Sequence, residues 1–254
     1  MSDVLVAGKS GQLAQALAHV SETPLHFRGA KDHDFFDIDA TARLIDQLGI
    51  KTLINTAAYT AVDQAESEPE AAYRLNAELP KAIAKACKLT DTKLLHISTD
   101  YVFDGEKPID EYYTPQDTPN PINIYGQTKL DGERAVLDAN DAASIIRTSW
   151  VISAFGKNFM TTMMTLMAQR DHLSIVNDQW GTPTQATDLA QRLLSNSAWN
   201  HLDHFASDRQ KTWFTLAEEI KEDNDFTCTL TPIPTSEYPT AAKRGTNTSL
   251  ETAP

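Results

Sequence analysis

Tyr125 and Lys129 lie four residues apart in the stretch YGQTK, at the start of a helix predicted near residues 124–139. Residues at this spacing lie above one another on one helix face, so a phenol and an ammonium group can meet one target. A free tyrosine has a pKa of about 10 and transfers a proton poorly at neutral pH unless a positive charge favours the phenolate. Lys129 would supply that charge. The alternative is an exposed pair on a solvated helix.

A hydroxyl group that completes this arrangement follows a strand predicted at residues 93–98. The stretch HISTDY places Ser98 and Thr99 at the carboxyl end of that strand. Ligands of open α/β sheets bind at this edge, and a hydroxyl there can hydrogen-bond to a substrate oxygen as its charge changes. We therefore expect Thr99, Tyr125 and Lys129 to form a catalytic group.

The N-terminal stretch VLVAGKSGQLA indicates a dinucleotide site. Gly8 and Gly11 stand between the first predicted strand and a helix that starts near Gln12. The first glycine allows a tight turn, the second lets the backbone approach a pyrophosphate, and the helix N-terminus favours negative charge. An ordinary strand-to-helix turn is the alternative. The position of the motif at the start of an alternating α/β pattern favours a nicotinamide dinucleotide, whose ribose Lys129 would hold.

The residues after the second predicted strand bear on the choice of cofactor. In FRGAKD, Arg28 and also Lys31 can accommodate a ribose 2′-phosphate, whereas a cofactor without that phosphate usually meets an acidic residue near this point. This favours NADPH over NADH. A solvated surface arginine is the alternative interpretation of Arg28.

Apolar runs alternate with helix-period segments through the first 150 residues. This order predicts a doubly wound, Rossmann-type parallel sheet covered by helices on both faces. Strands are expected at 4–8, 25–27, 52–58, 93–98 and 143–149, and helices from about 12 and near 40–48, 69–88 and 124–139.

A long Pro- and Asp-rich segment at 99–123 is expected to be a functional loop.

Beyond residue 150 the order is less regular. Later elements are expected as helices at 157–169, 187–197 and 214–222 and a strand at 173–176. We expect an NAD(P)-binding domain at 1–150 and a smaller α/β substrate lobe at 151–254, shortened at its C-terminus. Interleaving of this lobe with the first domain is the alternative to a simple division.

Composition excludes several classes of function. The 254 residues include 22 Lys and Arg against 35 Asp and Glu, a net charge of -13, which disfavours nucleic acid and anionic membranes as partners. Cys87 and Cys228 form no cluster that predicts a disulfide or a zinc site. We find no signal peptide and no apolar run of about 18 residues, so a cytoplasmic protein is expected.

Several stretches together resemble the dTDP-4-dehydrorhamnose reductase family of the extended short-chain dehydrogenases/reductases. The resemblance covers nearly the whole chain in order, and its central stretches are more specific than the glycine motif. They are GKSGQLA (8–14), INTAAYTAVDQAESEPE (54–70), HISTDYVFDG (96–105), PINIYGQTKLDGE (121–133), RTSWV (147–151), NDQWGTPT (177–184) and EYPTAAKR (237–244).

The resemblance implies the reduction of the C4 ketone of dTDP-4-dehydro-L-rhamnose to dTDP-L-rhamnose by NADPH or NADH. Tyr125 would give the C4 oxygen its proton, assisted by Lys129 and Thr99. The sugar nucleotide would meet Thr99, Asp100, Tyr101, Tyr125 and Trp150. The expected cofactor contacts are Gly8, Ser10, Gly11, Gln12, Leu13, Arg28, Asp37, Ile38, Ala57, Ala58, Tyr59, Thr60, Tyr125 and Lys129. Trp150 packing in the core and Asp100 bracing its loop remain alternatives.

The C-terminus departs from the family. Gly245 follows Lys243 and Arg244 where the family usually has a proline, and the family's further helix is missing. Substrate affinity is what this places in question, although Lys243 and Arg244 can still contact a nucleotide phosphate. Relatives are described as using Mg²⁺, but no carboxylate cluster predicts a metal site here. The oligomeric state is expected to be a monomer or a homodimer.

Two other functions fit the same fold. A cofactor-binding regulatory subunit, such as that of methionine adenosyltransferase, shares a DYVFDG stretch but would not oxidise NADPH. A sugar nucleotide epimerase or dehydratase would keep its cofactor bound and recycle it.

Overall fold

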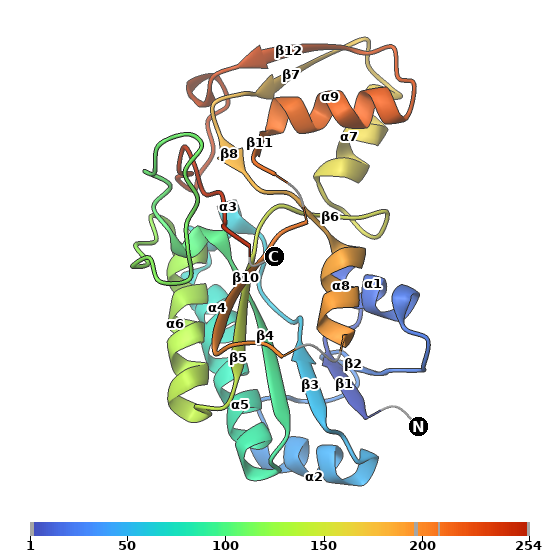
Figure 1. The fold of residues 1–254 in the computed structure, drawn as a ribbon, viewed down its shortest axis with the longest axis vertical. Helices are drawn as coiled ribbons and strands as arrows, with labels where there is room; N and C mark the ends of the chain where they lie inside the picture. The colour runs from blue at the N-terminus through green and yellow to red at the C-terminus, as the bar shows by residue number, and fades with distance from the viewer. Residues whose placement is uncertain (1–2, 196–197, 208, 253–254) are drawn as a thin grey trace.

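The computed structural model describes residues 3–195, 198–207 and 209–252 of the chain. Six strands of this described part form one parallel sheet in the order β10-β5-β4-β3-β1-β2 (Figure 1). They are β1 (Val4–Ala7), β2 (His26–Arg28), β3 (Thr52–Asn55), β4 (Lys93–Thr99), β5 (Ser144–Thr148) and β10 (Leu202–Phe205). β2 and β3 lie on opposite sides of β1, so the strand order reverses there, as it does where such sheets bind ligands. The predicted Rossmann-type sheet is confirmed.

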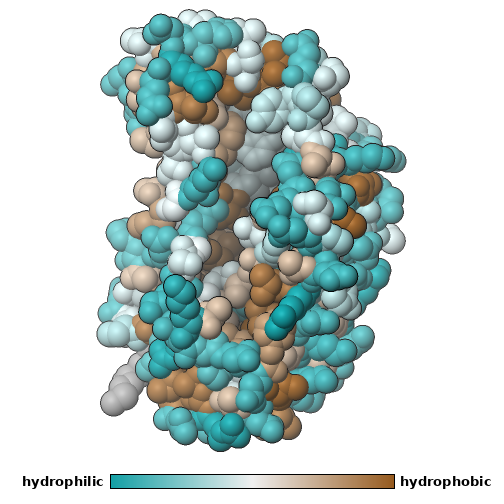
Figure 2. All heavy atoms as spheres, turned by 180° about the vertical axis from the view of Figure 1, so that it is seen from behind, coloured by the Kyte–Doolittle hydropathy of each residue, from teal (hydrophilic) through white to brown (hydrophobic). Residues whose placement is uncertain are grey.

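Residues after 150 divide between two packing units. The helices α7 (Phe159–Met167) and α9 (Trp213–Asp223) and the parallel pair β7 (His172–Val176) and β12 (Thr229–Ile233) enclose their own hydrophobic cluster at the top of Figure 1. Figure 2 shows the molecule from behind, hollowed between this unit and the sheet. α8 (Ala186–Leu194) instead packs with α1 (Gln12–Val20), and β10 pairs with β5.

A single cut at residue 150 would remove the edge strand β10 and the covering helix α8 from the sheet. We therefore propose that the substrate lobe consists of α7, β7, α9 and β12, and that α8 and β10 belong to the sheet domain. Two short pairs, β6 (Val151–Ile152) with β9 (Thr184–Gln185) and β8 (Trp180–Gly181) with β11 (Lys211–Thr212), join these parts. The expected helix at 187–197 ends at Leu194, and its last two residues lie outside the described part.

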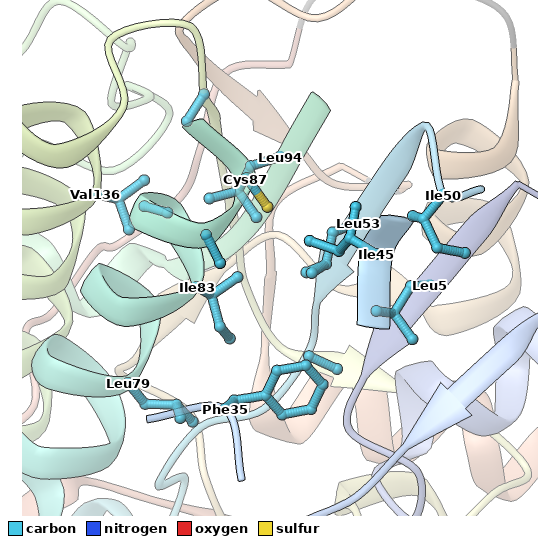
Figure 3. Packing of buried hydrophobic residues seen from close by; sticks show 14 of the residues in the cluster. Leu5, Phe35, Ile45, Ile50, Leu53, Leu79, Ile83, Cys87, Leu94 and Val136 are labelled. Carbon is cyan, nitrogen blue, oxygen red and sulfur yellow. The ribbon is translucent and has the colours of Figure 1, made fainter. Parts of the chain in front are cut away.

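Successive residues along the central strands cover opposite faces of the sheet, because the side chains of a strand alternate. In each pair of successive residues, the first packs with α2 (Ile38–Leu48), α5 (Leu79–Leu89) and α6 (Ile124–Ala139): Leu5, Leu53, Leu94 and Ile145. Figure 3 labels Leu5, Leu53 and Leu94 together with Ile45 of α2, Ile83 of α5 and Val136 of α6. The residue that follows each of these four strand residues points to the other face and packs with α1 and α8: Val6, Ile54, Leu95 and Ile146. Both faces are therefore buried, and the ends of the strands are left for a site.

The helix expected at 69–88 is interrupted. It consists of α4 (Pro69–Tyr73), a π-helical turn η1 (Arg74–Glu78) and α5. Pro80 has no N–H to donate to the carbonyl of Asn76 four residues earlier, so the regular helical bond cannot form there. That carbonyl instead lies against α6, where a Cβ on Gly132 would stand 1.9 Å from the Asn76 oxygen. The π-turn lets two helices approach at backbone distance.

The C-terminal segment 245–251 passes between the 103–113 loop and β8. The N–H of Asn247 donates to Gly105 O (2.9 Å), and the N–H of Trp180 donates to Thr246 O (2.7 Å). Gly105 has φ +74°, which other residues rarely adopt, and a Cβ on Gly245 would stand 2.5 Å from Asp104 O. Both positions therefore require glycine. The segment is thus held in place by backbone hydrogen bonds and close packing. Within the described ranges, no helix combines the length and apolarity that crossing a membrane requires.

Candidate active site

The first turn of α6 carries Tyr125 to the end of β4. Asn123 caps this helix by accepting the N–H of Gly126 at Oδ1 (2.8 Å). The short helix η2 (Asp100–Val102) continues β4, and a Cβ on Gly126 would stand 2.0 Å from Tyr101 O. Only glycine therefore lets α6 approach η2 so closely, and this approach brings Tyr125 beside Thr99.

Tyr125 is 9% exposed, and its phenol forms a hydrogen bond with the Thr99 side chain. The Tyr101 ring meets it edge-on, with centroids 5.6 Å apart. Burial raises the pKa of Tyr125, the Thr99 hydrogen bond lowers it by less, and the charge of Asp100 raises it further. A phenol in this environment keeps its proton at neutral pH, which suits a proton donor.

Lys129 is buried one turn further along the same helix face. Its Nζ donates to Ile97 O at 2.7 Å. Burial lowers the pKa of Lys129 to about 8, and the carboxylate of Glu133 partly offsets this. The groups that act on the pKa of Tyr125 are Thr99, Asp100 and Tyr101, whereas the charge of Lys129 acts on His96. The expected effect of Lys129 on the phenol therefore stays a prediction.

Asp100 is 1% exposed and lies directly after Thr99. Its Oδ1 accepts the Thr99 hydroxyl proton (3.1 Å) and its Oδ2 accepts that of Thr248 (2.6 Å), a residue of the C-terminal segment. Burial raises the pKa of Asp100 to about 6, although these hydrogen bonds lower it. The carboxyl group thus links the C-terminal segment to the candidate catalytic hydroxyl.

The glycine turn at the end of β1 has the form expected of a phosphate cradle. Gly8 has φ +109°, and a Cβ there would stand 2.4 Å from Thr56 Oγ1. Gly11 caps α1 without a side chain, so the first amides of this nine-residue helix have no side-chain acceptor from the cap. The side chain of Gln12 donates to Val151 O through Nε2 and accepts the hydroxyl proton of Ser153 at Oε1. Leu13 is buried and Ser10 is exposed.

The loop after β3 is held by a residue that the sequence did not indicate. The side chain of Asn76 accepts the N–H of Tyr59 (2.8 Å) and donates to Tyr59 O (3.1 Å) and Thr128 Oγ1 (3.1 Å). Asn76 therefore fixes the stretch 57–60, where cofactor contacts are expected at Ala57, Ala58, Tyr59 and Thr60. The interrupted helix around Asn76 is a signal of its role, because π-turns often occur at functional sites.

The predicted adenosine end of the site lies after β2. Arg28 donates to Phe27 O (2.9 Å), and Asp37 caps α2 at Ala40 N, directly before Ile38. Lys9 Nζ and Asp32 Oδ2 form an ion pair (3.5 Å) that the sequence does not indicate. Hydrogen bonding from Gly29 N–H holds the pKa of Asp32 below its usual value, and the charge of Arg28 contributes.

Trp150 is partly buried at the base of the substrate lobe and has φ +44°, in the left-handed region. Its indole stacks flat on Trp213, with centroids 3.4 Å apart and planes 4° apart. On Gly181, a Cβ would stand 2.4 Å from this indole. Trp213, at the start of α9, is a second residue that the sequence analysis missed; its Nε1 donates to Gln179 Oε1 (3.2 Å).

A cavity of about 1060 Å³ extends from the lobe to Tyr101, which contacts the candidate catalytic Tyr125. Its lining runs from Phe159 and Trp213 in the lobe to Tyr101 beside Tyr125. Arg244 lies at this end, where its guanidinium binds both carboxylate oxygens of Asp63 (2.9 and 2.8 Å). The cavity thus offers aromatic surface and a cation, and the buried phenol of Tyr125 lies behind Tyr101.

The structure thus brings Thr99, Asp100, Tyr101 and Tyr125 into contact, with Lys129 on the next turn. Trp150 belongs to the lobe side of the site, and Arg28, Asp37 and Ile38 lie near the far strands β1 and β2. Among the described residues, no group of three or more His, Cys, Asp or Glu side chains is placed to hold a metal ion.

Comparisons with known proteins agree with this geometry. The family described as RmlD substrate binding domain matches residues 1–254. The dTDP-4-dehydrorhamnose reductase of Salmonella typhimurium is 38% identical over 98% of this chain and 89% of its own length. That of Sinorhizobium fredii is 36% identical over 96% of this chain and 87% of its own.

A solved structure gives the same result. The dTDP-4-dehydrorhamnose reductase of Bacillus anthracis, in complex with NADP, superposes with a TM-score of 0.92 at 34% identity, over 98% of this chain and 90% of that one. The Thermus thermophilus UDP-glucose 4-epimerase, at 15% identity and a TM-score of 0.77, shares the fold. The chain belongs to the dTDP-4-dehydrorhamnose reductase family.

Proposed function

We propose that this protein reduces the C4 ketone of dTDP-4-dehydro-L-rhamnose to dTDP-L-rhamnose with NADPH. The observation that carries the proposal is the buried, protonated Tyr125, hydrogen-bonded to Thr99 at the carboxyl edge of the sheet and adjoining the cavity through Tyr101. The family membership supports the choice of substrate, since the relatives of this chain are named for that reduction.

The residues present fit a nicotinamide dinucleotide. The uncapped N-terminus of α1 offers amide donors to a pyrophosphate, and Asn76 holds the 57–60 loop beside the switch point of the sheet. When bound, NADPH supplies the hydride for the sugar carbon. The B. anthracis relative holds NADP, and the cations Lys9, after β1, and Arg28, at the end of β2, could meet a ribose 2′-phosphate, which supports NADPH over NADH.

In the chemical step Tyr125 transfers its phenolic proton to the C4 oxygen of the sugar. Thr99 then turns its own hydroxyl proton toward the phenolate, which is consistent with its lowering of the pKa of Tyr125. Lys129 holds positive charge one turn away and, with its pKa of about 8, can return a proton to the phenolate of Tyr125. Each of these steps is local to α6 and the end of β4.

Substrate binding is assigned to the cavity. Trp150 offers an aromatic face near the sugar, Trp213 supports that face, and Arg244 offers a cation to a phosphate group in exchange for Asp63. The C-terminal segment supports this assignment, because Arg244 lines the cavity and Thr248 binds Asp100.

The test follows absorbance at 340 nm with dTDP-4-dehydro-L-rhamnose and either NADPH or NADH, with and without Mg²⁺. We expect stoichiometric NADPH oxidation and formation of dTDP-L-rhamnose. A protein that binds NADPH but never oxidises it with this ketone would match the regulatory-subunit alternative. Tightly copurifying cofactor without net consumption would instead indicate an epimerase or dehydratase.

A further inference from the structure

A chain of hydroxyl and carboxyl groups connects the C-terminal segment to the catalytic tyrosine. Thr248 Oγ1 donates to Asp100 Oδ2 at 2.6 Å, and Thr99 Oγ1 donates to Asp100 Oδ1 at 3.1 Å. The Thr99 side chain in turn hydrogen-bonds Tyr125. The outer end of this chain, Thr248, lies 148 residues from Asp100 in the sequence.

The backbone around Thr248 is held by several hydrogen bonds. The N–H of Thr248 donates to Trp180 O (3.0 Å), and Ser249 O accepts the N–H of Tyr113 (2.7 Å). The preceding Asn247 is fully buried, and its Nδ2 donates to Pro108 O (2.7 Å) and Glu111 O (2.9 Å). These bonds fasten the segment on both sides of Thr248.

While Asp100 is ionised, its carboxylate is the best acceptor for the hydroxyl proton of Thr99, because hydrogen bonds to charged groups are stronger than those between neutral groups. With that proton on the carboxylate, Thr99 Oγ1 accepts the N–H of Tyr101 (3.2 Å), and these two bonds fix the hydroxyl group beside the phenol of Tyr125. A protonated Asp100 is a weaker acceptor and can itself donate to Thr99, so the Thr99 hydroxyl would lose its fixed orientation beside Tyr125.

We propose that Thr248 is a positioning residue of the active site, which holds Asp100 ionised and thereby holds Thr99 in the orientation that Tyr125 needs for proton transfer. This inference rests on the proposed reductase function. It concerns the orientation of the Thr99 hydroxyl before the reaction, since Thr248 contacts Asp100 and acts through it.

The pH dependence follows from the groups around Asp100. Burial raises the pKa of this carboxyl to about 6, and Thr248 is the first of the donors that lower it. Activity should therefore fall below about pH 6 and be retained from there up to the pKa of Lys129, about 8. The other titratable or charged groups facing this region titrate elsewhere or stay charged: Tyr125, Tyr101, Lys129, Asp63 and Arg244.

The decisive variant is Thr248→Val, which keeps the shape of the side chain and removes the hydroxyl. A hydrogen bond to a charged group corresponds to about one to two pKa units, so the acid limb of kcat should move up by about one to two pH units. At pH 7 this is a loss of about two- to tenfold, and at pH 9 the ratio to the parent should return toward one.

Two matched variants separate positioning from general damage. Thr248→Ser keeps the hydroxyl and should restore the acid limb. Thr246→Val makes the same change two residues away, where the side chain is exposed, and should leave the profile unchanged. An acid limb that stays in place in Thr248→Val would overturn the proposal, as would a shift of equal size in Thr246→Val.

A double-mutant cycle with Asp100→Asn tests whether Thr248 acts through this carboxyl group, and Thr248→Ala is the substitute if Thr248→Val folds poorly. The amide that replaces the carboxyl group cannot titrate, so adding Thr248→Val to Asp100→Asn should cause no further shift. A ¹³C NMR titration of the Asp100 carboxyl tests the same link without turnover, and its pKa should be higher in Thr248→Val. If the parent protein lacks reductase activity, the proposed function fails by itself; an unchanged Asp100 pKa would overturn the role of Thr248 in either case.

Discussion

Gly132 offers a test in which helix propensity and packing predict opposite signs. It lies inside α6, where replacement of glycine by alanine ordinarily stabilises a helix by about 1 kcal/mol. Here a Cβ would stand 1.9 Å from Asn76 O and 3.1 Å from the carbon of that carbonyl. Both atoms are backbone, so they cannot move aside as a flexible side chain could.

The cost of Gly132→Ala follows from that contact. Forcing an extra carbon into a packed interface typically costs about 1–3 kcal/mol, and the backbone contact places this site at the upper end. After subtraction of the propensity gain, the net loss is about 1–2 kcal/mol. For a chain of this size, that corresponds to a fall in Tm of about 2–8 °C.

The assay is thermal unfolding followed by circular dichroism, with NADPH affinity measured by fluorescence. Because Asn76 also holds Tyr59, its displacement should weaken cofactor binding as well. Asp138→Ala, an exposed change on the same helix, is the matched control and should leave both quantities nearly unchanged. An increased Tm in Gly132→Ala would refute the packing argument, because it would mean that α6 and η1 are further apart than described.

Two further predictions concern the two ends of the site. Trp213→Ala removes the ring stacked on Trp150, so KM for the sugar nucleotide should rise about tenfold while NADPH affinity stays within about twofold; equal losses in both would indicate general disruption of the lobe. Arg28→Ala should raise KM for NADPH by about tenfold and leave KM for NADH nearly unchanged, as steady-state kinetics with both cofactors would show; a parallel rise for both cofactors would remove the 2′-phosphate assignment.

The central sheet was predictable because most of its strands are short apolar runs that alternate along the chain with segments of helical periodicity. β10 was not, because the stretch LDHF is short and half polar and becomes a strand only through pairing with β5. The break at Arg74–Glu78 also escaped prediction, since the apolar spacing of 69–88 continues through it and only Pro80 marks the interruption.

The candidate site divides in the same way. Thr99, Tyr125 and the glycine turn stand out because local spacing and strand ends carry the signal. Asn76, Trp213 and Thr248 act through contacts between distant segments, and nothing in their own neighbourhood marks them. The resemblance of motifs gives the chemistry of the site, whereas the contacts that hold it in place require the three-dimensional structure.

Turnover of Tyr125→Phe tests the central claim most directly, because this change removes the proton donor and keeps the buried ring. NADPH oxidation with dTDP-4-dehydro-L-rhamnose should fall by about 10²–10⁴-fold, since a positioned general acid contributes about that much. NADPH binding, measured by fluorescence, should stay within about twofold of the parent protein. A variant that binds NADPH and turns over at the parent rate would show that Tyr125 does not supply the proton.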